Sequence, residues 1–130
     1  MNRSSGNPVH TVLVVDDEYL IAEILGMALE DAGFVVVIAN SALKGMEMLE
    51  RDRPDLVITD YMMPGMNGAE FARKIRSRPA FHLVPIVLMT GGQAQIGRSA
   101  PELFDEVFDK PFEINSMIAS IQALIARAGR

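Results

Sequence analysis

One stretch decides the fold: Thr11-Val12-Leu13-Val14-Val15-Asp16-Asp17, an apolar run that ends on two acids. A run of branched apolar residues without polar alternation is typical of a strand buried on both faces, as in a parallel sheet covered by helices. In such sheets, ligands bind outside the carboxyl ends of the strands. The two acids therefore indicate a polar site at that edge of the sheet.

Three further strand-like runs also end at a polar residue: Leu56–Thr59 before Asp60, Ile86–Met89 before Thr90, and Glu106–Asp109 before Lys110. Because parallel strands end at the same edge of a sheet, we expect acids, a hydroxyl and a cation to converge there. A fifth apolar run, Phe34–Ile38, completes the set of predicted strands.

Five helices are predicted between and after these strands. The first covers Tyr19–Ala32 before Gly33, a typical left-handed stop, with apolar residues at helical spacing: Ile21, Leu25, Ala28 and Ala32. The others start at Ser41 and end before Pro54, start near Asn67, cover about Gln93–Ser99, and cover Ile114–Ala128. This alternation predicts an α/β, flavodoxin-like, doubly wound fold: a five-stranded parallel sheet in the order 2-1-3-4-5, with helices on both faces.

Two local signals refine this prediction. Asn67 and Glu70 have the spacing of a capping box, so a helix is expected to begin there. The segment 93–99 follows two glycines and has low helix propensity, so we expect its helix to be the most mobile element.

Composition limits the possible classes of protein. The chain has 130 residues, 49% of them hydrophobic, which suits one domain over residues 11–130 after a flexible N-terminal tail over residues 1–10. It has no cysteine, which excludes a disulfide framework, a thiolate nucleophile and a cysteine zinc site. A net charge of -5 disfavours direct nucleic-acid binding, and the absence of a signal-like or long apolar stretch predicts a cytoplasmic protein without membrane insertion.

The predicted cluster has a definite chemistry. Carboxylates of Asp16, Asp17 and Asp60 at about 5 Å would repel by about 3 kcal/mol per pair, so they need a cation, and oxygen ligands favour Mg²⁺. Asp60 follows the central strand alone, so it can act as a nucleophile that forms an aspartyl phosphate. Lys110 and Thr90 would then supply the cation and the hydrogen-bond donor that phosphoryl transfer needs.

At these positions the chain resembles the response-regulator receiver domain family of two-component signalling, over about residues 9–128. Four motifs in order carry the resemblance: Val12–Glu18, Asp60 with Met63–Gly68, Thr90, and Asp109–Phe112. In isolation, the acids of the first motif could instead be a helix N-cap with acids that compensate the helix dipole.

The resemblance implies roles for single residues. Asp60 would accept the phosphoryl group from a phosphohistidine on a sensor histidine kinase or a histidine phosphotransfer protein. Asp17, Asp60 and the backbone carbonyl of Met62 would bind Mg²⁺ directly, and Asp16 would hold a metal-bound water. The Thr90 hydroxyl would bond the phosphoryl oxygen, Lys110 would be the cation, and the peptide bond after Lys110 would be cis.

The resemblance also implies a switch. Phosphorylation would alter the face built from the helix over 93–99, the strand Glu106–Asp109 and the helix Ile114–Ala128, and that face would bind a downstream protein. The expected protein is a stand-alone, chemotaxis-type regulator, a monomer or an activation-dependent dimer. Val107 stands where the family usually has a switching aromatic residue, and Phe108 should face the opposite side of the strand.

Three alternatives remain open at this point. The chain could be a pseudo-receiver that binds a partner without phosphorylation, which the absent switch aromatic favours, or a phosphate sink. An enzyme of the haloacid-dehalogenase type is disfavoured because Met62 occupies the place of its second acid, so we expect a signalling domain rather than an enzyme. Met62, Met63 and Met66 are interpreted as loop packing, and His10 and His82 as surface residues.

Overall fold

The structure is a computed structural model that describes residues 8–128. The predicted tail therefore lies largely outside the described residues, as do the last two positions of the predicted domain. The strands are β2 (Thr11–Val15), β3 (Val35–Ala39), β4 (Leu56–Asp60), β5 (Ile86–Thr90) and β6 (Glu106–Asp109). The helices are α1 (Tyr19–Asp31), α2 (Ala42–Asp52), α3 (Gly68–Arg76), α4 (Ala94–Arg98) and α5 (Ile114–Ala128), with a short 3-10 helix η1 at Pro79–Phe81.

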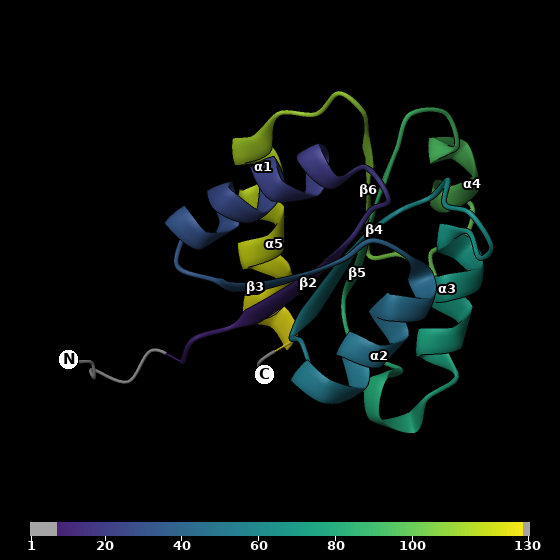
Figure 1. The fold of residues 1–130 in the computed structure, drawn as a ribbon, viewed down its shortest axis with the longest axis horizontal. Helices are drawn as coiled ribbons and strands as arrows, with labels where there is room; N and C mark the ends of the chain where they lie inside the picture. The colour runs from purple at the N-terminus through teal and green to yellow at the C-terminus, as the bar shows by residue number, and fades with distance from the viewer. Residues whose placement is uncertain (1–7, 129–130) are drawn as a thin grey trace.

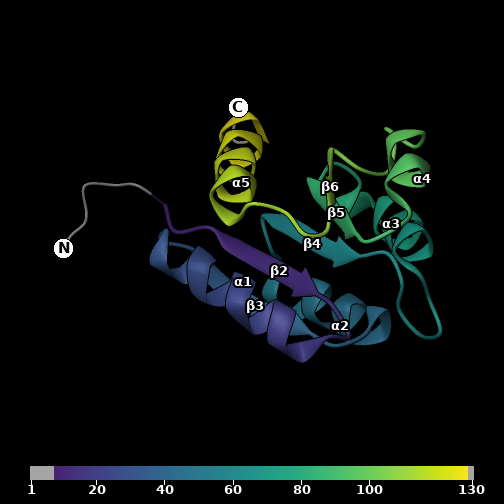
Figure 2. The ribbon, with the colours of Figure 1, turned by 90° about the horizontal axis from the view of Figure 1, so that it is seen from above.

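All five strands are parallel, and they lie in the order β3-β2-β4-β5-β6. Counted along the chain, this is the predicted order 2-1-3-4-5. Figure 2 shows the arrows of β2 and β4 pointing the same way, so their carboxyl ends share one edge of the sheet. The fold prediction is confirmed.

Two apolar clusters cover the two faces of the sheet. Alternation along β2 sends Leu13 and Val15 into a cluster with α2 and α3, and Val12 and Val14 into a cluster with α1 and α5. Figure 1 shows the same division, with α1 and α5 on one side of the strands and α2, α3 and α4 on the other. β4 and β5 are buried along their whole length, and β2 is buried except at Thr11.

The predicted helix signals are present in the structure. The Ser41 hydroxyl accepts a hydrogen bond from the backbone N–H of Lys44, and Asn67 and Glu70 form both bonds of a capping box at 2.9 Å. Gly33 has a φ of 100°, the left-handed conformation expected after a helix.

Two sequence predictions need correction. The second strand begins at Val35 rather than Phe34, because the N–H of Phe34 still donates to the Leu29 carbonyl and closes the end of α1. The buried face of α1 also differs from the predicted one. Ala32 was expected in the core but is exposed, whereas Gly26 was not expected there but is buried. A Cβ on Gly26 would lie 3.3 Å from Ile38 Cδ1, so this glycine lets α1 approach β3 closely.

The helix predicted over 93–99 is shorter than expected, since α4 has only five residues. Gln93 and Ser99 form its two ends instead of lying within it. The sequence analysis did not predict η1. Among residues 8–128, none of the helices has both the length and the apolarity that crossing a bilayer requires.

Candidate functional site

Three carboxylates meet at the carboxyl edge of the sheet. Asp16 and Asp17 follow β2, Asp60 ends β4, and one oxygen from each lies within 4.8 Å of the others. Val15 is in register with Thr59, so the next residue of each strand, Asp16 and Asp60, is brought to the same level. Asp16 is fully buried and Asp60 is 5% exposed, whereas Asp17 is exposed. The predicted acid cluster is therefore present.

Burial makes these charges costly. It raises the pKa of Asp16 to about 6, although the N–H of Glu18 donates to the carboxylate at 2.9 Å and lowers the pKa. Burial also raises the pKa of Asp60 above its usual value, against the opposing effect of Lys110. A cation beside these groups would relieve the cost of keeping both charged.

One lysine lies against the acids. The Nζ atom of Lys110 is 3.2 Å from Oδ1 of Asp60, 3.4 Å from Oδ2 of Asp16 and 3.6 Å from Oε1 of Glu18. Burial alone would lower the pKa of Lys110, but the charges of Asp16 and Asp60 outweigh it and raise that pKa. The backbone also holds this residue: its N–H donates to the Thr90 carbonyl at 2.8 Å, and the bond to Pro111 is cis.

Asp60 is oriented by two donors on the same oxygen. Oδ1 accepts from the backbone N–H of Tyr61 at 2.9 Å and from Lys110. Within the part of the chain that the structure describes, no hydrogen bond reaches Oδ2. A carboxylate held in this way keeps one oxygen for a ligand or an electrophile.

The hydroxyl of Thr90 is fully engaged. Thr90 ends β5, is wholly buried, and donates from Oγ1 to Oε1 of Gln93 at 3.1 Å. The same oxygen accepts from the backbone N–H groups of Gln93, at 3.0 Å, and of Gly92, at 3.3 Å. Thr90 lies at this edge as predicted, whereas the part played by Gln93 was not predicted from the sequence.

A cleft of about 480 Å³ opens above these groups. It is lined by the two polar loops after β2 and β5, by Asp60, and by Met62 and Lys110: the loop members are Asp17, Glu18, Gly91, Gly92 and Gln93. The loop after β4 is folded tightly, because a Cβ on Gly68 would lie 2.5 Å from the Asp60 carbonyl oxygen. The cleft is wide enough for a phosphoryl group and a hydrated ion.

The donor set fits a hard divalent cation. The carboxylates of Asp16, Asp17 and Asp60 offer only oxygen, the ligand type that Mg²⁺ and Ca²⁺ prefer. Lys110 offsets one of three negative charges, so a divalent ion would bring the cluster close to neutrality. Met62, whose backbone carbonyl was also predicted as a ligand, lines the cleft at its rim.

Comparison with known proteins decides the family. A model of the response regulator receiver domain matches residues 12–122. The chain belongs to this family. Receiver domains are signalling domains that generally bind Mg²⁺ at an acidic pocket and interact with histidine kinases or phosphotransfer proteins, and this chain has a cluster of three acids.

Curated relatives of the receiver domain are longer proteins. This chain is 37% identical over 131 residues to "Probable transcriptional regulatory protein TcrX" of Mycobacterium tuberculosis, and the match covers 99% of this chain and 55% of that protein. It is 31% identical to the phosphate regulon transcriptional regulatory protein PhoB of Pseudomonas aeruginosa, covering 92% of this chain and 53% of PhoB. The chain thus spans about half the length of the curated relatives it matches.

Solved structures of similar size share the fold. The chemotaxis response regulator CheY4 of Vibrio cholerae has a TM-score of 0.82 and 25% identity, over 90% of this chain and 99% of that chain. A response regulator receiver domain protein from Clostridium thermocellum has a TM-score of 0.84 and 27% identity, over 93% of this chain and 98% of that chain.

The receiver domain also bears out the prediction for β6. Val107 packs in the cluster of α2 and α3, whereas Phe108 packs in the cluster of α1 and α5. The Phe108 ring lies 6.0 Å from that of Phe112, on the face away from α4. A Cβ on Gly97 would lie 3.0 Å from Cγ2 of Val107 and 2.5 Å from Cδ2 of Leu88, so α4 lies directly on the strands.

The methionines of the loop after β4 differ from one another. Met63 is buried and Met66 packs against the same cluster, as predicted. Met62 is 61% exposed, so its interpretation as loop packing is wrong. His82 is an exposed surface residue, as predicted, and His10 is half-buried.

Proposed function

We propose that this receiver domain accepts a phosphoryl group on Asp60, in a Mg²⁺-dependent reaction, from a phosphohistidine of a sensor histidine kinase or a histidine phosphotransfer protein. The observation that supports this most directly is the setting of Asp60. Its carboxylate lies at the floor of an open cleft, with Lys110 and a backbone N–H on Oδ1 and no described hydrogen bond on Oδ2.

The transfer exchanges one bond for another. An oxygen of Asp60 forms a bond to phosphorus while the bond between phosphorus and the donor imidazole nitrogen breaks, and the electron pair of that bond returns to the nitrogen. Negative charge spreads over the three phosphoryl oxygens, so catalysis depends on positioning and neutralisation. Lys110, already 3.2 Å from Asp60, offsets this charge, and the Thr90 hydroxyl donates a hydrogen bond to a phosphoryl oxygen.

The metal ligands are proposed from the match to the receiver family, and the acid cluster supports them. Asp17, Asp60 and the backbone carbonyl of Met62 would hold Mg²⁺ directly, and Asp16 would hold a water of the ion. When bound, Mg²⁺ supplies further neutralisation of the phosphoryl oxygens.

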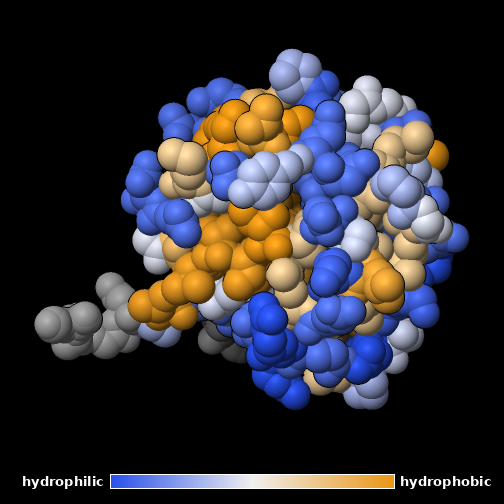
Figure 3. All heavy atoms as spheres, viewed as in Figure 1, coloured by the Kyte–Doolittle hydropathy of each residue, from blue (hydrophilic) through white to orange (hydrophobic). Residues whose placement is uncertain are grey.

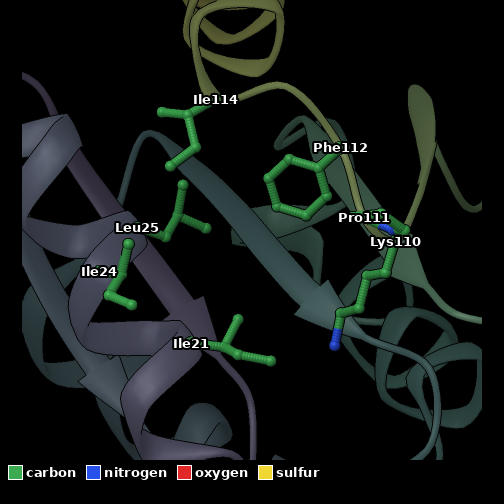
Figure 4. Close-up of a pocket in the computed structure, with 7 residues that line it drawn as sticks. All are labelled: Ile21, Ile24, Leu25, Lys110, Pro111, Phe112 and Ile114. Carbon is green, nitrogen blue, oxygen red and sulfur yellow. The ribbon is translucent and has the colours of Figure 1, made fainter.

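The donor protein has an apolar surface to dock on beside the site. A groove of about 390 Å³ runs between α1 and the start of α5, and Figure 4 shows its lining: Ile21, Ile24, Leu25, Pro111, Phe112 and Ile114, with Lys110 at one end. Figure 3 shows apolar atoms gathered over this part of the surface. Lys110 belongs to both the groove and the acid cleft, so a helix of the donor seated there would bring its histidine over Asp60.

The output surface is the face of α4, β6 and α5. It adjoins the loop of Gly91, Gly92 and Gln93, which lines the cleft with Asp60 and leads into α4. Phosphorylation shifts the population of its conformations, and a downstream protein binds the shifted form.

The proposal is tested by incubating the chain with Mg²⁺ and acetyl phosphate and measuring its intact mass. We expect a gain of one phosphoryl group that disappears in Asp60→Asn and is kept in Asp31→Asn, a matched change of an exposed acid at the end of α1. No gain in the wild type, or an equal gain in Asp60→Asn, would contradict it. Equal affinity of a partner for the wild type and Asp60→Asn would favour a pseudo-receiver instead.

A further inference from the structure

The buried Thr90 hydroxyl has one hydrogen, and that hydrogen is already used. Oγ1 donates it to Oε1 of Gln93 at 3.1 Å, and accepts from the backbone N–H of the same residue at 3.0 Å. Gln93 thus holds the hydroxyl by two hydrogen bonds, one that its side chain accepts and one that its backbone N–H donates. Its side chain also lines the cleft above Asp60.

A hydroxyl can donate only one hydrogen bond at a time. Under the proposed function, the Thr90 hydroxyl must donate to a phosphoryl oxygen on Asp60. It therefore has to leave Oε1 of Gln93 first. The two acceptors compete for the same hydrogen.

We propose that Gln93 is a positioning residue that holds the Thr90 hydroxyl in the resting protein, so that phosphorylation of Asp60 breaks this hold and releases the start of α4. The inference rests on the proposed function, since it needs a phosphoryl group as the competitor. Gln93 acts through Thr90, with which it forms two hydrogen bonds.

Release is transmitted to α4 by its backbone. Gln93 is the N-cap residue of α4. Its carbonyl accepts a hydrogen bond from the N–H of Gly97 within this short helix. Gly97 packs directly against Val107, so a shift of α4 changes the packing around the Val107 side chain. Switching by this route needs no rotating aromatic ring, which agrees with the valine at position 107.

The test is a double-mutant cycle on binding of beryllofluoride, a phosphoryl mimic, measured by calorimetry with Mg²⁺ present. Gln93→Ala removes the competing acceptor, so we expect about threefold to tenfold tighter binding, the size of effect that one exchanged hydrogen bond supplies. Gln95→Ala is the matched control, because Gln95 is an exposed glutamine of α4 that lies outside the hydrogen bonds of Thr90.

The cycle is completed in the Thr90→Ala background. There, Gln93→Ala should leave the affinity for beryllofluoride unchanged, since the hydroxyl through which Gln93 acts is gone. An equal effect of Gln93→Ala in both backgrounds, or no effect in the wild type, would overturn the inference.

Amide hydrogen exchange gives an independent readout. Beryllofluoride should speed exchange at the Gly97 amide of the wild type, and Gln93→Ala should show the faster exchange before the mimic is added. Unchanged exchange in both would also overturn the inference. A wild type that gains no phosphoryl group would instead overturn the proposed function, so the two failures are distinguishable.

Discussion

The Nζ atom of Lys110 lies 3.2 Å from Oδ1 of Asp60, although 50 positions separate the two residues in the chain. The contact exists because β4 and β6 end at the same edge of one parallel sheet, with β5 between them. The same ammonium also contacts Asp16, so one positive charge offsets part of the negative charge of a site that contains three carboxylates. Four predictions test what this arrangement does.

Lys110→Met should slow phosphorylation of Asp60 by acetyl phosphate by about a hundredfold, because one preorganised positive donor at the phosphoryl oxygens is lost. The rate of mass gain measures this effect. Lys44→Met, at an exposed position on α2, should keep the wild-type rate. A Lys110→Met protein that reacts as fast as the wild type would contradict the role given to this ammonium.

Mg²⁺ should raise the free energy of unfolding, because the ion binds the folded acid cluster and not the unfolded chain. At about 100 times its dissociation constant, it should add about 3 kcal/mol, and EDTA should remove this gain. Chemical unfolding with and without Mg²⁺ measures it. Asp17→Asn should lose most of the gain, whereas Glu30→Gln, at the far end of α1, should retain it. Equal gains in the two variants would exclude the acid cluster as the binding site.

Without metal, the protein should become less stable as the pH rises from about 4 to about 6. Burial raises the pKa of Asp16 from 3.8 to about 6, so the unfolded chain loses this proton first and binds fewer protons than the folded chain throughout that interval. Asp60 shifts in the same direction. We expect a loss of about 1–3 kcal/mol in the free energy of unfolding.

Urea unfolding of the metal-free protein at a series of pH values measures this loss. Asp16→Asn should flatten the curve between pH 4 and 6, and should be more stable than the wild type at neutral pH when EDTA is present. If the stability of the metal-free wild type rises through this interval, the folded protein stabilises the ionised form of Asp16, which would contradict the prediction.

Gly68→Ala should disrupt the loop after β4. Its Cβ would lie 2.5 Å from the Asp60 carbonyl oxygen and 2.9 Å from Cα of Tyr61, and neither backbone atom can move without moving the site. We expect a loss of about 1–3 kcal/mol in the free energy of unfolding, together with slower phosphorylation. Gly91→Ala is the control, because a Cβ there meets nothing within 4 Å. Equal stability of the two variants would refute the steric argument.

The layers, the strand order and most residues of the candidate site are predictable from the amino-acid sequence. Apolar runs such as Leu56–Thr59 specify strands buried on both faces, and the polar residue after each run must lie at the carboxyl edge because parallel strands end together. The capping box of Asn67 and Glu70 was also predictable, because both partners lie within one turn of the same helix.

Other features depend on packing, burial and side-chain conformations that only the folded chain specifies. Gly26 lies on the buried face of α1 because it lets the helix approach β3 closely, and a residue without a side chain gives no apolar signal in the sequence. The raised pKa of Asp16 follows from its burial under other elements. The bonds between Thr90 and Gln93 depend on the conformation of the short turn before α4 and on the side-chain rotamers it allows. Periodicity and strand ends specify where a residue lies in the fold, whereas its partners, its burial and its protonation are set only when the packed elements meet.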